Sequence, residues 1–320
     1  MKGIRYLALF CFGILSGLLI LTFASNGGKN NLPFSVTAPI PEGLLNTFPR
    51  VLGANDHWYP HLKNSVPNQP PTLSATSAIA YDVTQDRLLY AKNEKERLPI
   101  ASLTKIMTAL LAIENDSLSD DYVVSKNASL IGENAMGLSP GEKLRLKDLL
   151  YGMMLPSGND AAEAIAENSR FGRDEFVFQM NKRAEELGMA NTRFSNPSGL
   201  EGDGKQYSTA IDLLILSRHA MNNLDFAEIV GTYEYEIPET KNHKYYFLKN
   251  DTNLLTSYPG VKGIKTGFTW EAGMCLVTYF EQDGTKIIAV LLNSQDRRGE
   301  MKMLLDYSLR VSGKTPPKHE

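Results

Sequence analysis

The sequence predicts an α+β domain in which strands from both ends of the folded region share one antiparallel sheet. Two observations predict this arrangement. Segments with strand patterning lie near the start of regular structure and again near the end of the chain, and the segments between them repeat apolar residues at helical spacing. Strands segregated from helices in this way pair with one another and are covered by the helices. The chain has 320 residues, of which 42% are hydrophobic, so it can bury a core of this kind.

The strand predictions rest on two hairpins. In the second hairpin the strands flank Asp283-Gly284, a dipeptide that favours tight hairpin turns. The predicted strands are Ser77–Asp82, Arg87–Ala91, Met274–Glu281 and Thr285–Asn293. The predicted helices are Leu103–Glu114, Leu146–Leu155, Asp160–Ser169, Asp174–Leu187, Ile211–Met221 and Arg298–Val311. We expect Asp160 to cap the start of the helix Asp160–Ser169, and Gly188 to end the helix Asp174–Leu187.

A long apolar run stands at the N-terminus. It extends from Tyr6 to Ala24 without a charged residue and follows Lys2 and Arg5, the pattern of a signal peptide or a membrane anchor. The run exceeds the roughly 7–15 residues of a signal-peptide core and falls within the roughly 17–25 residues of a spanning helix. An uncleaved anchor is therefore favoured over a signal peptide cleaved near Ala24, and in both cases the remainder of the chain is exported.

These patterns divide the chain into four expected regions. Residues 1–25 form the anchor or signal peptide. Residues 26–75 form a linker, because frequent proline and glycine interrupt any long periodicity there. Residues 76–312 form the folded domain, and residues 313–320 form a polar tail.

Composition and charge exclude several classes of protein. With 33 basic and 36 acidic residues the formal net charge is −3, and there is no basic stripe of the kind that binds nucleic acid. The two cysteines, Cys11 in the apolar run and Cys275 far along the chain, exclude a disulfide scaffold and a cysteine-based zinc site. His57 and His61 are separated by Pro60, which disfavours the helix that would align them on a metal. No metal and no cofactor are predicted.

The first candidate motif is Ser102-Leu103-Thr104-Lys105, at the start of a predicted helix. Residues three apart lie on one helical face, so we expect the serine hydroxyl and the lysine amine to meet. Serine is a weak nucleophile without an adjacent base, and lysine can be that base when burial or a neighbouring cation lowers its pKa. The free N–H groups at a helix start can stabilise a developing oxyanion. Alone, the pattern also fits a helix cap followed by a surface lysine.

Two tripeptides complete the set of motifs. Ser157-Gly158-Asn159 lies in a break between two predicted helices, although Ser125-Lys126-Asn127 has the same spacing and both fit ordinary turns. Lys265-Thr266-Gly267 precedes the C-terminal hairpin. Its lysine offers a cation for a carboxylate, and Gly267 allows another backbone to approach closely. Taken alone, this tripeptide is as compatible with a turn as with a binding site.

In this order the three motifs resemble the set that penicillin-binding proteins and serine β-lactamases share. From about residue 76 to residue 311 the chain resembles the low-molecular-mass penicillin-binding proteins that are D-alanyl-D-alanine carboxypeptidases. The stretches that carry the resemblance are 97–109, 155–162, 194–200, 207–210 and 263–269. It implies a β-lactamase/DD-peptidase-like fold, with an all-α lobe beside the sheet, and a serine peptidase that acts on peptidoglycan.

The resemblance implies how acylation would occur. Ser102 would attack the peptide bond between two terminal D-alanines and form an acyl-enzyme, and Lys105 would take the serine proton. Ser157 would relay a proton to the leaving amine, and Asn159 would hold the substrate backbone. The backbone N–H groups of Ser102 and Phe268 would form the oxyanion hole. Water would then release the shortened stem peptide.

The resemblance also implies how the substrate's end would be recognised. Lys265 would supply positive charge for the terminal carboxylate and lower the pKa of Lys105, and Thr266 would bind that carboxylate beside Gly267. Some relatives have an arginine upstream of this motif. Residues 250–255 contain no arginine, so a third partner for the carboxylate is not assigned.

The expected partners follow from the same resemblance. They are stem peptides ending in D-Ala-D-Ala, β-lactam antibiotics as covalent inhibitors, and the membrane through the N-terminal segment, with no nucleic acid. The domain is expected outside the cytoplasm, held at the membrane or secreted after cleavage.

Other functions share parts of this pattern. A DD-endopeptidase that cuts D-Ala cross-links would use the same residues. A β-lactamase with a glutamate-activated water would carry Glu-x-x-Leu-Asn near residue 193, where residues 190–194 read Ala-Asn-Thr-Arg-Phe. A non-catalytic penicillin-binding sensor is disfavoured by the intact serine and lysines. Residues 137–141 fit the Gly-x-Ser-x-Gly elbow of α/β-hydrolases, but Pro140 after Ser139 lacks the N–H that this oxyanion hole requires.

Overall fold

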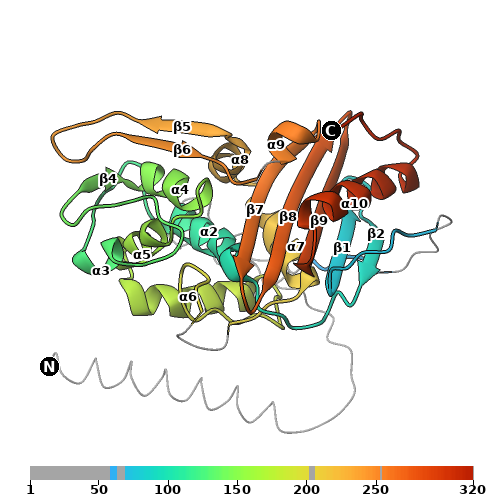
Figure 1. The fold of residues 1–320 in the computed structure, drawn as a ribbon. Helices are drawn as coiled ribbons and strands as arrows, with labels where there is room; N and C mark the ends of the chain where they lie inside the picture. Colours follow the sequence, from blue (N-terminus) through green and yellow to red (C-terminus); the bar gives the residue numbers. More distant parts are fainter. Residues whose placement is uncertain (1–57, 63–68, 202–205, 253, 320) are drawn as a thin grey trace, which may run out of the picture. The chain divides into compact units, whose positions relative to one another are not determined.

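The computed structural model describes residues 58–62, 69–201, 206–252 and 254–319 and confirms the α+β fold class (Figure 1). A five-stranded antiparallel sheet has the strand order β2-β1-β9-β8-β7. Its strands are β1 (Ser77–Asp82), β2 (Arg87–Lys92), β7 (Val261–Thr269), β8 (Gly273–Gln282) and β9 (Thr285–Ser294). β1 pairs with β9, with Ser77 opposite Leu292 and Asp82 opposite Ile287. The strands of the two predicted hairpins therefore lie in one sheet.

Helices cover the sheet and also form a lobe beside β7 (Figure 1). The six predicted helices are present, with bounds that differ by a few residues from the predicted ones. The helices are the 3-10 turn η2 (Ala101–Thr104), α2 (Lys105–Asn115), α3 (Lys126–Ser129), α4 (Leu146–Met154), α5 (Asn159–Asn168), α6 (Arg173–Glu186), α7 (Ala210–Ala220), α8 (Leu224–Gly231), α9 (Leu254–Ser257) and α10 (Arg297–Val311). Two small sheets pair β3 (Asp121–Val123) with β4 (Lys143–Arg145), and β5 (Glu234–Ile237) with β6 (Tyr246–Lys249).

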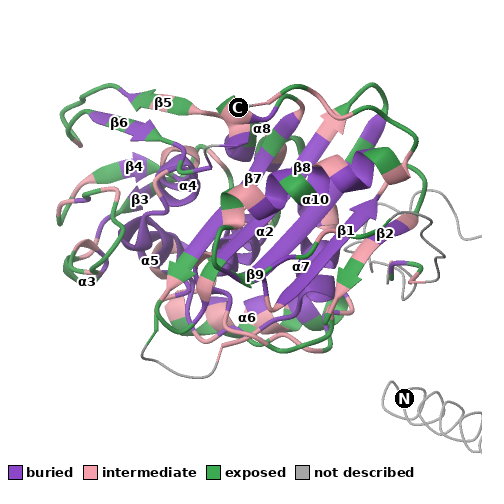
Figure 2. Ribbon diagram, turned by 45° about the vertical axis from the view of Figure 1, so that its right-hand side comes forward, coloured by how far each residue is buried: buried purple, intermediate pink, exposed green. Residues whose placement is uncertain are grey.

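Both faces of the central sheet are buried. Residues 287–292 of β9 are all fully buried, and their alternate side chains belong to two separate hydrophobic clusters. One cluster includes α7 and the helices of the lobe. The other is closed by α10 through Met301, Leu304 and Leu305, and Figure 2 shows α10 lying across this face of the sheet. The sheet is thus a central layer, and β7 is its edge next to the lobe.

The strand β7 was not predicted. It contains Lys265-Thr266-Gly267, and its nine residues mix two glycines with lysine, threonine and apolar residues. This composition has no hydrophobic period from which a strand could be recognised, so the tripeptide also fitted a turn. The small sheets and α8 were missed as well, whereas Gly188 ends α6 as predicted, with φ +79° directly after Leu187.

The predicted capping role of Asp160 is wrong. α5 begins at Asn159, and Gly158 occupies the N-cap position without a side-chain hydrogen bond. The Asp160 carboxylate instead accepts hydrogen bonds from the backbone N–H groups of residues 136–138, at 2.8 to 2.9 Å. A carboxylate in the first turn still faces the positive end of the helix dipole. Three N–H groups of the neighbouring loop converge on this one carboxylate, and hydrogen bonds to a charged acceptor are stronger than those to a neutral one.

Residues 58–62 pack against the domain. The indole N–H of Trp58 donates a hydrogen bond to Asp86 Oδ1 at 3.1 Å, and the guanidinium carbon of Arg218 lies 4.2 Å from the ring centroid. Asp86 lies in the turn between β1 and β2, at the opposite edge of the sheet from β7. Among the described residues, no helix is long and apolar enough to cross a membrane. The candidate anchor Tyr6–Ala24 lies outside the described residues.

Glu300 of α10 links this helix to the segment that precedes β1 through hydrogen bonds. Its carboxylate accepts hydrogen bonds from the backbone N–H groups of Ser74 and Ala75 and, at 2.6 Å, from the hydroxyl of Ser294. Glu300 is buried and lies in the first turn of α10, where the helix dipole favours negative charge. Burial alone would raise the pKa of Glu300, but these hydrogen bonds, that of Ser294 above all, outweigh it and hold the pKa below its ordinary value.

We expect Glu300→Gln to lower the free energy of unfolding at pH 7 by about 1–3 kcal/mol, the range for hydrogen bonds to a charged group. Because the folded-state pKa is depressed, this stabilisation is present above the unfolded pKa and is lost as pH falls through the folded pKa. Urea unfolding at pH 7 and at about pH 3.5 measures both effects, since the difference between variant and wild type should shrink in acid. An equal difference at both pH values would show that the carboxylate does not act through its charge.

Candidate active site

Ser102 and Lys105 lie on one side of the turn that begins α2. Residues 101–104 form η2 and α2 starts at Lys105, so the hydroxyl and the amine face each other. Lys105 Nζ donates a hydrogen bond to Ser102 Oγ at 2.9 Å. Lys105 is fully buried, whereas Ser102 is partly exposed. A substrate can therefore reach the serine while the amine behind it is shielded from bulk water.

The amine of Lys105 has two further partners. It donates hydrogen bonds to Asn159 Oδ1 and to the carbonyl oxygen of Ser198, both at 2.7 Å. Burial lowers the pKa of Lys105 well below its ordinary value, and the nearby charge of Lys265 lowers it further, while two carboxylates act in the opposite direction. The amine is consequently neutral at a lower pH than an ordinary lysine, and the neutral form is the one that can accept a proton.

Ser157 and Asn159 lie in the connection between α4 and α5. Ser157 has φ +64°, a conformation that residues other than glycine rarely adopt. Its hydroxyl is buried and has no hydrogen-bond partner within the part of the chain that the structure describes. The Asn159 side chain donates from Nδ2 to the carbonyl of Gly132 at 3.1 Å. Backbone strain together with an unpaired buried hydroxyl is typical of a functional position.

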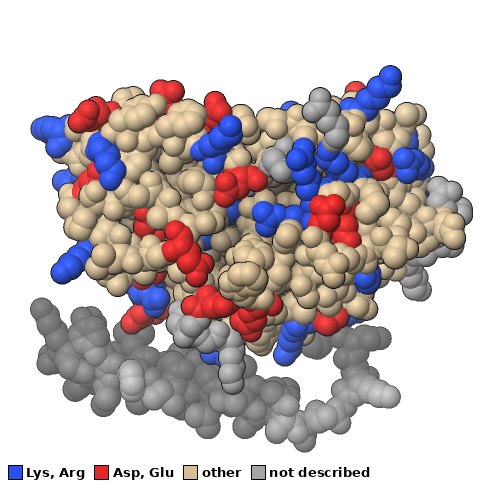
Figure 3. Space-filling view, viewed as in Figure 1, with Lys and Arg blue, Asp and Glu red and all other residues tan. Residues whose placement is uncertain are grey.

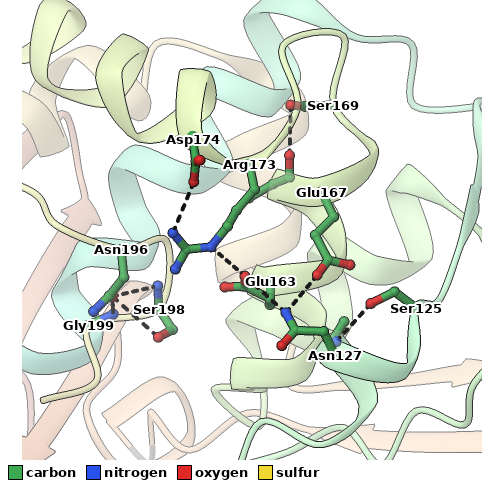
Figure 4. A network of polar contacts seen from close by, with 12 residues as sticks. Ser125, Asn127, Glu163, Glu167, Ser169, Arg173, Asp174, Asn196, Ser198 and Gly199 are labelled. Atoms are coloured by element: carbon green, nitrogen blue, oxygen red, sulfur yellow. Dashed lines mark hydrogen bonds and ion pairs between the residues drawn. The ribbon is translucent and has the colours of Figure 1, made fainter. Parts of the chain in front are cut away.

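An ion pair with a buried carboxylate holds the helix that carries Asn159. One turn further along α5, Glu163 accepts a hydrogen bond from Arg173 Nε at 2.6 Å, at the start of α6 (Figure 4). Glu167, another turn along, accepts from Asn127 Nδ2 of α3 at 2.7 Å. Glu163 is buried whereas Arg173 is partly exposed, so removing the arginine would leave a buried charge without compensation. α3 and α6 therefore fix the direction of α5, and with it the position of Asn159.

β7 brings the third motif against the turn that holds Ser102. A Cβ atom on Gly267 would lie 3.0 Å from a carbonyl oxygen of that turn and 3.3 Å from the Ser102 backbone nitrogen, so glycine permits the close approach. Lys265 and Thr266 are buried, whereas Phe268 is 48% exposed. Because β7 is the edge strand, alternate N–H and C=O groups on its free side have no strand partner.

A second cation that the sequence analysis missed lies beside this motif. Arg297, the first residue of α10, donates from Nη1 to the Gly267 carbonyl at 2.7 Å. Burial lowers the pKa of Lys265 to about 8, with Asp251 raising it and Arg297 lowering it further. Arg297 supplies a cation that residues 250–255 lack. No local pattern marks it, since Arg297 follows β9, which β8 separates from β7, and only the tertiary fold brings its side chain to Gly267.

The loop at residues 196–199 was likewise not predicted to be part of the site. Asn196 Oδ1 accepts hydrogen bonds from the N–H groups of Ser198 at 3.1 Å and Gly199 at 2.7 Å (Figure 4). This arrangement presents the Ser198 carbonyl to Lys105. Gly199 has φ +91°, and a Cβ atom there would lie 2.0 Å from the carbonyl oxygen of Ala101. The composition of the loop is typical of a tight turn. The stretch 194–200 contributed to the family resemblance, but nothing in its composition indicates the contact with Lys105, which is far away in sequence.

The alternative serine has a different environment. Ser139 Oγ accepts a hydrogen bond from the exposed Lys244 at 3.0 Å, and the Ser139 N–H donates to Glu142 at 2.7 Å. Cys275 is buried and its pKa is raised to about 11, which makes it unreactive. The described residues contain no group of three or more His, Cys, Asp or Glu that could hold a metal ion. Of these three candidate nucleophiles, Ser102 is therefore the one with a buried amine beside it.

The comparison with protein families agrees with this geometry. The family model described as D-alanyl-D-alanine carboxypeptidase matches residues 64–296, more than half of the chain. The chain belongs to this family. The resemblance inferred from the three motifs is thereby confirmed.

Curated members of the family show how much of each protein is shared. The D-alanyl-D-alanine carboxypeptidase DacF of Bacillus subtilis is 38% identical over 242 residues, which are 73% of this chain and 62% of that protein. A D-alanyl-D-alanine carboxypeptidase of a Streptomyces species is 33% identical over 265 residues, 75% of this chain and 89% of that protein. DacC of Escherichia coli is 32% identical, over 76% of this chain and 63% of its own length. The chain thus spans less than two thirds of DacF and DacC.

Solved structures confirm the DD-peptidase fold. The Streptomyces K15 DD-transpeptidase is 33% identical, has a TM-score of 0.71, and is covered completely by 76% of this chain. A D-alanyl-D-alanine carboxypeptidase of Mycobacterium tuberculosis is 28% identical with a TM-score of 0.69, and 82% of this chain covers all of it.

We expect the pKa values of Lys105 and Lys265 to lie below those of the other lysines. With lysine labelled at Cε, the NMR signal of Lys265 should titrate near 8 and that of Lys105 well below its ordinary range. Lys265→Met should raise the pKa of Lys105, because it removes a positive charge that disfavours protonation of the amine. The matched control is Lys147→Met, which removes a half-exposed lysine paired with Glu228 and should leave the pKa of Lys105 unchanged. An unshifted Lys105 in Lys265→Met would contradict the coupling.

Proposed function

We propose that this chain is a serine-type D-alanyl-D-alanine carboxypeptidase that removes the terminal D-alanine from peptidoglycan stem peptides. The observation that carries the proposal is the buried amine of Lys105, which lies 2.9 Å from Ser102 Oγ and has a lowered pKa. A hydroxyl next to an amine whose pKa is lowered well below its ordinary value is an activated nucleophile, because the neutral amine can take its proton. Membership of the family supports the choice of substrate.

In the proposed acylation, Lys105 Nζ takes the proton of Ser102 as Oγ bonds to the carbonyl carbon of the penultimate D-alanine. The developing oxyanion accepts hydrogen bonds from the backbone N–H groups of Ser102 and Phe268. The buried hydroxyl of Ser157, which has no hydrogen-bond partner among the described residues, receives the proton from Lys105 while giving its own to the amine of the departing D-alanine, so Lys105 is neutral again. Asn159 holds both Lys105 and the substrate backbone. The peptide bond breaks, leaving an ester on Ser102.

The carboxylate of the substrate would lie at the cationic end of the site. Lys265 supplies buried positive charge, and Thr266 offers a hydroxyl beside it. We assign Arg297 as the third partner, because its guanidinium already contacts the Gly267 carbonyl and adds to the same positive field. A free C-terminal carboxylate satisfies these cations, so the site would favour the end of a peptide over its interior. This polarity favours carboxypeptidase over endopeptidase action.

Release of the product requires water to attack the ester. Once D-alanine has departed, water can reach the substrate ester. Neutral Lys105 takes a proton from the water as its oxygen bonds to the acyl carbon, and returns that proton to Ser102 Oγ as the ester bond breaks. A β-lactam keeps its leaving group tethered to the acyl part. The chain has no counterpart of the glutamate with which one class of β-lactamase activates water, so the proposed acyl-enzyme with a β-lactam persists.

We further propose that the run Tyr6–Ala24 holds the domain at the outer face of the cytoplasmic membrane. Its length, its lack of charge and the preceding Lys2 and Arg5 support this placement. The substrate class supports it too, because peptidoglycan lies outside that membrane. In this arrangement the region 26–75 is a tether, and the catalytic region follows from residue 76 to residue 312.

We expect benzylpenicillin to form one covalent adduct, on Ser102, detected by intact-mass measurement and peptide mapping. Ser102→Ala should lose the adduct, and so should Lys105→Arg, because arginine stays protonated and cannot act as base. Ser139→Ala is the matched control and should keep it. The same protein should release D-alanine from Nα,Nε-diacetyl-L-Lys-D-Ala-D-Ala. An adduct on Ser139, or continuous turnover of penicillin, would refute the assignment.

Deletion of residues 1–25 should move the protein from the membrane fraction to the soluble fraction while penicillin binding is retained. The physical reason is that the apolar run supplies the burial in lipid, whereas residues 58–62 already pack against the domain. Cell fractionation and N-terminal sequencing of the full-length protein provide the measurement. A mature protein that begins near Ser25 and is free of membrane would replace the anchor with a signal peptide.

A further inference from the structure

Two aromatic side chains are exposed where β7 leaves the site. Phe268 follows Gly267 directly and is 48% exposed, and Trp270 is 91% exposed. Their rings pack edge to face, with centroids 5.6 Å apart. Trp270 contributes little to the stability of the fold, since most of its side chain is exposed to water. Large apolar side chains grouped beside a binding site are typical of surfaces that contact a ligand.

Two carboxylates accompany this aromatic pair. Glu201 accepts a hydrogen bond from the N–H of Glu271 at 2.9 Å, and the hydrogen bonds from Thr269 and Glu271 hold the pKa of Glu201 below its ordinary value. Glu201 and Glu271 are both exposed. On the face drawn in Figure 3, acidic and basic side chains are interspersed, so a charge preference for a substrate requires a local grouping such as this one. Lys265, the buried cation of the site, lies at the other end of residues 265–271.

The path of a bound peptide leads to this grouping. β7 is an edge strand, and an extended peptide that pairs with it advances by about 3.3 Å per residue, the same rise as the strand. The terminal carboxylate of the bound peptide would lie at Thr266 and its reacting carbonyl at the N–H of Phe268. The peptide residue before D-Ala-D-Ala then lies about one residue beyond Phe268 along the chain. Its side chain is then next to residues 269–271.

We propose that Phe268 and Trp270, with Glu201 and Glu271, form a subsite for an amino-bearing alkyl side chain on the residue that precedes D-Ala-D-Ala. The methylene groups pack on the indole ring, and the ammonium group lies between the ring face and the carboxylates. Aromatic faces attract ammonium groups, and long alkyl stems cover apolar rings while their charged end stays in water. This subsite rests on the proposed function, since it places the peptide by its carboxylate and reacting carbonyl.

The test compares two peptides that differ only in this charge, using the full-length protein in detergent. Nα-acetyl-L-Lys-D-Ala-D-Ala keeps the ε-amine, and the Nα,Nε-diacetyl form does not. Release of D-alanine gives kcat/KM for each. We expect the wild type to favour the free amine by about tenfold, the size of a partly desolvated cation–π contact. In Trp270→Ala the ratio should fall towards one, and in Glu271→Gln it should fall in part.

Phe178→Ala is the matched control, because it removes another exposed aromatic ring, on α6, and should leave the ratio unchanged. Equal kcat/KM for both peptides in the wild type, or an unchanged ratio in Trp270→Ala, overturns the subsite while leaving the proposed function intact. Release of D-alanine from neither peptide refutes the proposed function, and the subsite with it. A lower rate for both peptides in Trp270→Ala with the ratio unchanged assigns the ring to general packing and overturns the charge preference.

Discussion

Burial of the Lys105 amine is the constraint on which the rest of the site depends. An ammonium group enclosed by protein loses its hydration, so its pKa falls unless hydrogen bonds and opposite charge compensate. Here Ser102, Asn159 and the Ser198 carbonyl supply the hydrogen bonds, and Lys265 adds a repulsive charge. The balance leaves an amine that is held in place and yet readily loses its proton. Each of the elements around it contributes one of these contacts.

Close approach of backbones makes this enclosure possible. Gly267 of β7 and Gly199 of the neighbouring loop both lie against the turn from Ala101 to Ser102, where a Cβ atom would collide or press on main-chain atoms. The strand and the loop therefore fix the nucleophile from two sides. Ser157 adds a third constraint from the lobe, with a strained backbone and a buried hydroxyl that has no hydrogen-bond partner among the described residues. Rigid main chain, rather than flexible side chains, sets the distances.

The polarity of the site changes along β7. Two cations, the buried Lys265 and the partly buried Arg297, lie where the strand meets α10, and exposed aromatic rings and carboxylates lie where it turns towards β8. A peptide with a free carboxylate at one end and an amine near the other matches both parts. Because β7 is an edge strand, the backbone of such a peptide can pair with it in register. Recognition of both ends of the peptide would then position the reacting carbonyl, with no further binding group required.

The sequence by itself determined the secondary structure of the two hairpins and the six longer helices, since hydrophobic spacing and turn residues are local properties. It also determined that Ser102 and Lys105 meet, because residues at positions i and i+3 lie on one face of a helical turn. Only the tertiary structure decided the rest. β7 lacks a hydrophobic period, Asp160 is drawn to a neighbouring loop, and Arg297 and Ser198 reach the site from distant positions in the chain. Such contacts depend on the order of strands and the packing of helices, which no short stretch of sequence encodes.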